Sequence, residues 1–268
     1  MMKNFKDQMG NEVLLPAMPM RIVSLVPSQT ELLFDLGLEK HIVGVTKFCV
    51  HTESKVEVVE KIGGTKKFDL KKIMDLQPDL IIGNKEENYK KGIEDLQKNF
   101  PVWMSDIKDI YDALFMIQSI GELTGQEEKA FHLAYKIKKG LTEYHAPYNL
   151  TASYLIWKDP FMTIGEDTFI HEMLKIAGFN NIFRDKKRYP VVSEEDIKER
   201  SPEVIFLSSE PYPFVEKHLE EFRQLCPDAL VILVDGEMFS WYGSRLQHSV
   251  FYFKTLEKNI LQWLGQRT

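Results

Sequence analysis

Two segments far apart in the chain repeat the same pattern. The first is IMDLQPDLII at residues 73–82, and the second is IKERSPEVIF at residues 197–206. Each has an isoleucine, a proline five positions later, an acidic residue directly after the proline, and then an apolar run. In the same order, ELLFDLG at 31–37 has a counterpart in EMLKIAG at 172–178. This internal duplication predicts two similar lobes.

The pattern within each lobe indicates an α/β fold. From Arg21 onward, short β-branched runs alternate with longer segments of helical periodicity, which is typical of parallel strands connected by helices. The strands are expected at residues 22–26, 42–45, 80–83, 102–104, 152–157, 204–208 and 230–235. The fold class predicted is therefore two Rossmann-like α/β lobes with mostly parallel central sheets.

Capping residues locate several helix ends. Ser28 followed three residues later by Glu31 predicts a capping box, and Gly37 suits the C-terminus of that helix. Asp69 and Ser193 stand at matching places before the two repeated segments, where each is expected to cap a helix.

One long helix is expected between the lobes. A second capping box, Thr124 with Glu127, precedes apolar positions at helical spacing, and Pro147 follows them. Such a helix is a rod of roughly 30 Å, long enough to join two domains. The predicted division is an N-terminal lobe at 1–122, a connecting helix at 123–147 and a C-terminal lobe at 148–268.

Composition excludes several classes of function. The net charge of −6 comes with lysines scattered among acids, so no broad cationic face for nucleic acid is expected. Two cysteines cannot form a disulfide framework, and no window approaches the ~20 apolar residues of a membrane helix. The N-terminus lacks the apolar stretch of a secretory signal. We expect a monomer that stays in the cytoplasm as given or has lost a leader.

Polar and aromatic residues gather in the loops that follow the predicted strands, where α/β sheets bind ligands. In the first lobe the strand at 80–83 continues into NKEEN at 84–88. In the second lobe the loops are rich in aromatic residues, which are Trp157, Phe161, Tyr189, Tyr212, Phe239, Trp241 and Tyr242. They could line a shared cleft, or individual rings could pack into the core. Arg245 follows them and suits a carboxylate or phosphate on a ligand, or it caps neighbouring helices or forms a surface pair.

A Cys-x-His pair raises a second possibility. Cys49 and His51 are residue types that ligate metals, and Glu86 and Glu87 could add carboxylates. The alternative function is thus a cytoplasmic metal-handling protein or enzyme. If Cys49 binds no metal, it is expected to be an ordinary half-buried thiol. No nucleophile elbow, P-loop or dinucleotide fingerprint is present, so neither a catalytic residue nor a cofactor is predicted. A third interpretation is an interaction module without a ligand.

Several motifs together resemble a known family. They are RIVSLVPSQTELLFDLGL, DLKKIMDLQPDLIIG, GEDTFIHEMLKIAGFNNIF and YPVVSEEDIKERSPEVIFLSSEPYPF. The chain resembles the substrate-binding proteins of ABC importers for cobalamin, siderophores and haem, and YPVVS and SSEPYPF are most similar to the cobalamin-binding branch. The resemblance implies two α/β lobes joined by a long helix, a small metal-chelate ligand bound between the lobes without catalysis, and a location outside the cytoplasm.

The resemblance also implies roles for individual residues. Cobalamin-binding members hold the corrin with aromatic residues; Phe48 and Tyr189 match these, whereas Thr65 and Asn84 stand at matching first-lobe positions. The family docks on its permease through one glutamate per lobe, here Glu195, with Lys71 at the equivalent first-lobe position. The full set of predicted ligand-binding residues is Phe48, Thr65, Lys66, Asn84, Lys85, Glu86, Trp157, Tyr189, Tyr212, Trp241, Tyr242 and Arg245.

Overall fold

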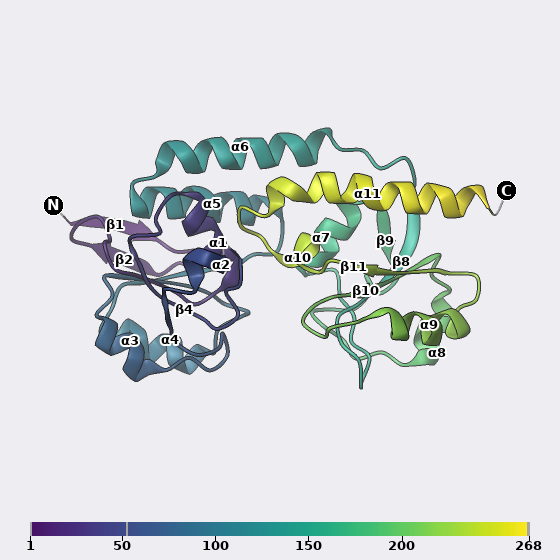
Figure 1. Cartoon of the computed structure of the whole chain (residues 1–268), viewed down its shortest axis with the longest axis horizontal. Coiled ribbons are helices and arrows are strands. Elements are labelled where there is room, and N and C mark those ends of the chain that lie inside the picture. The colour runs from purple at the N-terminus through teal and green to yellow at the C-terminus, as the bar shows by residue number, and fades with distance from the viewer. Residues whose placement is uncertain (1, 52, 267–268) are drawn as a thin grey trace. The chain divides into compact units, whose positions relative to one another are not determined.

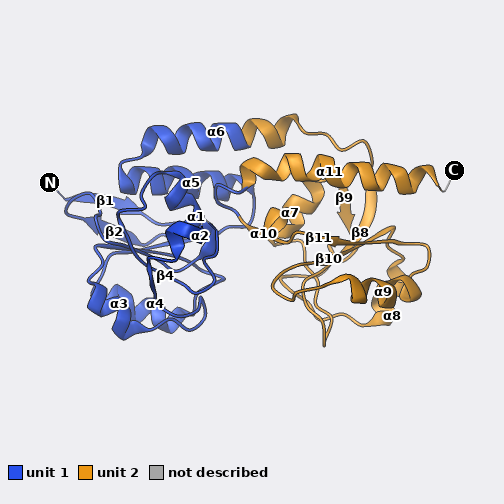
Figure 2. Ribbon diagram, in the orientation of Figure 1, with its two compact units in different colours: residues 1–137, 242–245 blue, residues 138–241, 246–268 orange. Residues whose placement is uncertain are grey.

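The computed structural model of the protein describes residues 2–51 and 53–266. The chain forms two compact units (Figure 2), of which unit 1 holds residues 1–137 and 242–245 and unit 2 holds residues 138–241 and 246–268. The boundary falls inside helix α6 (Glu127–Glu143), and the chain returns to unit 1 for a short segment before its last helix. The lobe boundaries expected from the sequence stay a prediction.

Unit 1 is built on a five-stranded parallel sheet in the order β5-β4-β3-β6-β7. Its strands are β3 (Ile22–Ser24), β4 (Ile42–Val45), β5 (Glu60–Lys61), β6 (Leu80–Asn84) and β7 (Val102–Ser105). Its helices are α1 (Pro27–Asp35), α2 (Glu53–Val56), α3 (Leu70–Leu76), α4 (Lys90–Gln97) and α5 (Ile110–Thr124). An antiparallel hairpin, β1 (Lys3–Lys6) with β2 (Glu12–Leu15), precedes them.

Unit 2 contains a four-stranded parallel sheet in the order β11-β10-β8-β9. Its strands are β8 (Leu150–Leu155), β9 (Phe179–Asn181), β10 (Val204–Ser208) and β11 (Leu230–Val234). Its helices are α7 (Phe169–Ile176), α8 (Glu194–Arg200), α9 (Leu219–Leu225), α10 (Glu237–Ser240) and α11 (Leu246–Gly265) (Figure 1). The predicted fold class and all seven predicted strands are confirmed, with strand ends shifted by at most two residues. The short elements β1, β2, β5 and β9 were missed.

The repeated segments have the same local structure. Asp69 accepts a hydrogen bond from the Lys72 N–H (3.1 Å) at the start of α3, and Ser193 accepts one from the Asp196 N–H (3.1 Å) at the start of α8. Each helix then ends in a left-handed residue directly before the repeated proline, with φ of 43° after α3 and 44° after α8. Both predicted caps are therefore confirmed.

The acidic residue of each repeat ties two strands together. The Asp79 carboxylate, just before β6, accepts hydrogen bonds from the N–H groups of Met20 and Arg21 (2.8 Å each), just before β3. The Glu203 carboxylate, just before β10, accepts them from the N–H and the hydroxyl of Thr151 in β8 (2.8 and 3.0 Å). Each acid thus satisfies donors where the neighbouring strand begins, β3 in unit 1 and β8 in unit 2.

Two predicted capping boxes are wrong. Helix α1 begins at Pro27, one residue before Ser28, because proline is already set in a helical φ and needs no donor at the first position. Thr124 is the last residue of α5, and its hydroxyl donates back to the Ile120 carbonyl (2.6 Å) instead of capping a following helix. Gly125, with a φ of 67°, ends α5, so the helix predicted at 123–147 is the shorter α6.

Helices α5 and α6 lie side by side (Figure 1). A Cβ added at Gly121 would lie 2.3 Å from the Ala130 Cβ, so the two helices approach too closely for a larger residue there. The buried face of α6 repeats at helical spacing, as Ala130, Ala134, Ile137 and Leu141. This packing stabilises a helix of 17 residues, which spans about 26 Å.

Candidate functional site

In unit 1 the parallel strands all end at one edge of the sheet, and the loop after β6 is the most tightly built there. Asn84 ends β6 and is 1% exposed. Its Nδ2 donates to the Ser105 hydroxyl (2.9 Å), and its Oδ1 accepts from the N–H groups of Glu86 (2.8 Å) and Glu87 (3.1 Å). Its amide therefore shapes the loop, and contact of Asn84 with a ligand stays a prediction.

Asn88 closes the same loop from its other end. Its Oδ1 accepts from the Asn84 N–H (2.8 Å), and its Nδ2 donates to the carbonyls of Leu25 (3.3 Å) and Thr65 (3.1 Å). Asn88 was not predicted from the sequence. The signal was an asparagine at each end of the loop, since asparagine side chains commonly bond to nearby backbone groups.

Two lysines border this loop. The Lys66 ammonium donates to the Glu86 carbonyl, and the Lys85 ammonium forms an ion pair with Asp106 (2.7 Å). Lys66 is exposed, and the Lys85 side chain is 49% exposed, so its pair adds only about 0–1 kcal/mol to stability. Both lysines are therefore exposed beside the loop, and Glu86 is half-buried.

The segment 242–245 returns to unit 1 and is held there by two carboxylates. The Tyr242 hydroxyl donates to Glu87 (2.7 Å), and Tyr242 is 7% exposed, so burial raises the pKa of its phenol. The Arg245 guanidinium binds Glu31 through two hydrogen bonds of 2.9 and 2.6 Å. Burial raises the pKa of the Glu31 carboxyl, and Arg245 offsets part of that rise. Arg245 was expected to contact a ligand, cap a helix or form a surface pair; the structure shows an ion pair within unit 1 whose side chains are only 11% and 13% exposed.

Cys49 lies after β4 and is 4% exposed. Its Sγ is 3.2 Å from the Thr30 hydroxyl oxygen and 3.3 Å from that of Thr46, and burial raises the pKa of the thiol. A cysteine ligand must be a thiolate, so this environment disfavours metal binding. Among the residues that the structure describes, no three His, Cys, Asp or Glu side chains form a group that could hold a metal ion. Nothing there supports the predicted pairing of Cys49 with His51.

The equivalent loop of unit 2 follows β10. Ser208 ends this strand, at the position that Asn84 has in the repeat. Its hydroxyl accepts from the Tyr154 hydroxyl (3.2 Å) and donates to the Glu210 carbonyl (2.7 Å). The last residue of β6 and the last residue of β10 thus each hold the loop that follows.

Glu210 is the most constrained acidic group of this loop. Its carboxylate accepts from the Ser240 hydroxyl and from the Trp241 indole N–H (3.0 Å), and burial raises its pKa. A Cβ at Gly236 would lie 2.6 Å from the Glu210 Cγ, so only glycine fits beside it. Glu210 was not predicted from the sequence, although the repeat aligns it with Glu86.

The aromatic residues of the strand-end loops divide by exposure. Phe239, Trp241 and Tyr242 are buried, at 0%, 8% and 7% exposed. Contact of Trp241 and Tyr242 with a ligand stays a prediction. Trp157 is 40% exposed and meets the Tyr212 ring edge-on, with centroids 5.7 Å apart.

A cationic side chain lies near each of two further aromatic rings that were predicted to bind a ligand. Phe48 is 50% exposed, and the Lys47 ammonium lies 5.0 Å from its ring centroid. Tyr189 is partly buried, with the Arg188 guanidinium 5.8 Å from its ring centroid. Phe48 and Trp157 are thus the most open rings predicted to contact a ligand.

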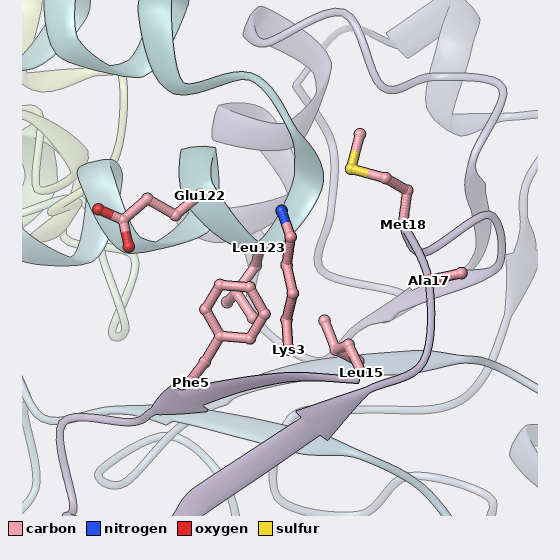
Figure 3. A pocket seen from close by; sticks show the side chains of 7 residues that line it. All are labelled: Lys3, Phe5, Leu15, Ala17, Met18, Glu122 and Leu123. Atoms are coloured by element: carbon pink, nitrogen blue, oxygen red, sulfur yellow. The ribbon is translucent and has the colours of Figure 1, made fainter. Parts of the chain in front are cut away.

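A small cavity in unit 1 lies away from these strand ends. It has a volume of about 60 Å³ and is lined by Lys3, Phe5, Leu15, Ala17, Met18, Glu122 and Leu123 (Figure 3). Ligand pockets for organic molecules usually measure ~300–1,000 Å³, so this cavity is too small for one.

Comparison with known proteins decides the family. A family described as periplasmic binding proteins matches residues 22–230. The chain belongs to this family. It is 28% identical over 194 residues to a vitamin B12-binding protein of Vibrio parahaemolyticus, covering 70% of each chain. It is also 28% identical over 213 residues to the ABC transporter substrate-binding lipoprotein YvrC of Bacillus subtilis, covering 74% of this chain and 67% of the relative.

Solved structures of periplasmic binding proteins share the fold. The vitamin B12 binding protein BtuF of Vibrio cholerae superposes with a TM-score of 0.77 at 23% identity, covering 90% of this chain and 97% of BtuF. The haem-binding protein RhuT from Roseiflexus superposes with a TM-score of 0.77 at 19% identity, covering 89% of this chain and 98% of RhuT. A protein of an Fe³⁺-hydroxamate transport system from Saccharomonospora viridis superposes with a TM-score of 0.74 at 19% identity, covering 96% of this chain and 98% of that protein. The family resemblance read from the sequence is confirmed.

The two predicted docking residues of this periplasmic binding protein lie at matching helix positions. Glu195 and Lys71 are both exposed, and each stands two residues after the capping residue of its helix, Ser193 and Asp69.

No helix in the described part of the chain has the length and apolar character needed to cross a bilayer.

Proposed function

We propose that this periplasmic binding protein is the substrate-binding component of an ABC importer and that its ligand is a small metal chelate of the corrinoid, haem or siderophore type. The observation that carries the proposal is the family match over residues 22–230, which takes in the parallel sheet of unit 1 and strands β8, β9 and β10 of unit 2. The names of its relatives and structural neighbours refer to vitamin B12, haem and Fe³⁺-hydroxamate. The protein binds and releases this ligand without chemical change.

The strand-end loops suggest which part of each unit meets the ligand. Phe48 and Trp157 offer apolar ring surface of the kind that holds planar or bulky chelates. Lys85 and Glu86 add charged groups on the unit 1 side, where cobalamin-binding relatives are expected to have a ring. The ligand is therefore more polar on the side that meets unit 1.

The alternative of a metal-handling protein or enzyme has no observation in its favour. Cys49 is buried against two hydroxyl groups, and the carboxylate of Glu87 accepts a hydrogen bond from Tyr242. The matched relatives are binding proteins by name.

Docking on a permease would use the N-terminal turns of α3 and α8. The first turn of α8 is acidic, with Glu194, Glu195 and Asp196, whereas the first turn of α3 has no acid and presents Lys71. A permease that serves this protein therefore presents basic residues to unit 2 and an acidic or neutral surface to unit 1.

Titration calorimetry with cyanocobalamin, haemin and a ferric hydroxamate siderophore tests the proposal. We expect one of the three to bind with a dissociation constant in the micromolar range or tighter. Trp157→Ala should weaken that binding about tenfold or more, because a ring contact is lost. Phe251→Ala, which removes a 78% exposed ring from α11, is the matched control and should leave binding unchanged. Absence of binding for all three ligands by folded protein would overturn the proposal.

A further inference from the structure

Helix α6 exposes two aromatic rings on one of its faces. Phe131 is 55% exposed and Tyr135 is 59% exposed. They are four residues apart on one helix, so they lie on the same face, one turn apart. Together the two rings form an apolar patch, and apolar patches with a charged rim are a feature of interaction surfaces.

Exposed charges flank the two rings in a symmetric order. Glu127 and Glu128 lie at the N-terminal end of α6, and Lys138 and Lys139 lie toward its C-terminal end. Three residue pairs are centred on residue 133. They are Glu127 with Lys139, Glu128 with Lys138, and Phe131 with Tyr135. Along the helix, two acidic residues are thus followed by two aromatic residues and then by two basic residues.

We propose that α6 pairs with α6 of a second copy of this chain, antiparallel, about a two-fold axis at residue 133. In that arrangement the acidic end of each helix faces the basic end of the other, and Phe131 of each copy faces Tyr135 of its mate. A two-fold interface is made from one surface patch used twice, so the patch must be complementary to itself in reverse. The pattern on α6 meets this condition.

The helix dipole and a lipid surface each account for only part of the pattern. Acids at the N-terminus and lysines at the C-terminus also favour the helix dipole, but that effect does not require exposed rings between them. An anionic membrane would attract the lysines and repel Glu127 and Glu128. Within the helix, Glu128 lies 3.9 Å from His132 and Lys139 lies 3.9 Å from Glu143, and these weak, exposed pairs can be exchanged for contacts with the second copy.

The dimer should be weak. A single helix pair of about 26 Å buries less area than the ~1,200 Å² of a standard stable interface. We therefore expect a dissociation constant of about 10–100 µM, with dimer that appears as the protein concentration rises and falls as added salt screens the charges.

Sedimentation equilibrium on charge-reversed proteins tests the inference. The E127K/E128K variant and the K138E/K139E variant should each be monomeric, because each places like charges opposite each other. An equimolar mixture of the two variants should form a heterodimer, since opposite charges then meet at both ends. The quadruple variant that carries both reversals should dimerise with itself. Restoration by mixing cannot come from variants that fail to fold.

Replacement of the rings supplies the second arm and its control. F131S/Y135S should remove the dimer at concentrations where the wild-type protein forms it, whereas F251S, which changes a 78% exposed ring on α11, should leave it intact. Wild-type protein that stays monomeric at every concentration would overturn the inference. Dimerisation of either charge-reversed variant alone, or a mixture that stays monomeric, would do so as well. The outcome does not depend on which ligand the protein binds.

Discussion

The ion pair between Arg245 and Glu31 should be the strongest single attachment of the returning segment to unit 1. The two side chains are 11% and 13% exposed and make two hydrogen bonds, of 2.6 and 2.9 Å. Removal of one partner leaves the other charge largely buried without a counter-charge, which costs ~3–5 kcal/mol in fully buried pairs. Because both groups retain some solvent contact, we expect about 3 kcal/mol for Arg245→Met and a similar loss for Glu31→Met.

The double variant should lose much less stability than the sum of the two single losses. Replacement of both charges by apolar side chains of similar size leaves no buried charge, so Arg245→Met with Glu31→Met should cost no more than about 3 kcal/mol. The interaction energy from the cycle is then at least about 3 kcal/mol. This magnitude distinguishes a desolvated pair from an exposed one, which contributes about 0–1 kcal/mol.

Native-state hydrogen exchange measures the effect in each unit separately. Amide groups of β6 should exchange about 100-fold faster in either single variant, since 1.36 kcal/mol corresponds to a factor of ten. Amide groups of β10, the repeat-related strand of unit 2, serve as the internal control and should change little. Additive losses in the double variant would refute the reasoning, because they would show that the two charges do not stabilise each other.

Three further predictions concern the strand-end loops and the buried thiol. Asn84→Ala should lower the unfolding free energy of unit 1 by about 2–3 kcal/mol, because two loop N–H groups lose their acceptor. Burial raises the folded-state pKa of Glu210 above its ordinary value of 4.5. The contribution of Glu210 to stability is therefore fully present below pH 4.5 and is lost as the pH rises through the folded pKa. In urea unfolding, Glu210→Gln should make this decline of stability with pH less steep. A thiol reagent should modify Cys226 but not Cys49 until the protein unfolds, because Cys49 is 4% exposed.

Each of these predictions has a matched control. Asn180→Ala removes an exposed hydrogen bond to Asn149 and should cost well under 1 kcal/mol; an equal cost at both sites would contradict the role given to the loop amide. Glu216→Gln, at an exposed position, should leave the pH dependence unchanged, and an unaltered decline in Glu210→Gln would show that another group causes it. Cys226→Ser should abolish labelling of folded protein; continued labelling would show that Cys49 is accessible.

The sequence predicted the main strands and their parallel arrangement well because strand formation here depends on local pattern. Runs such as 80–83 and 204–208 are buried on both faces, so they are apolar throughout and bounded by turn residues. The caps at Asp69 and Ser193 were also predictable, since a cap bonds to a residue three positions away. The predicted box at Thr124 failed because a left-handed glycine directly after it decided the helix end.

The sequence by itself determined the duplication, the α/β class, the family and the residues that gather at the strand ends. Those properties are written in local periodicity and in motifs that recur along the chain. Only the tertiary structure decided which of the gathered residues remain exposed. Asn84, Tyr242 and Arg245 find partners 21, 155 and 214 positions away, and no spacing rule anticipates such pairings. A polar group that is buried must be satisfied by whichever neighbour the fold brings to it, so its role depends on contacts that form only after the chain has folded.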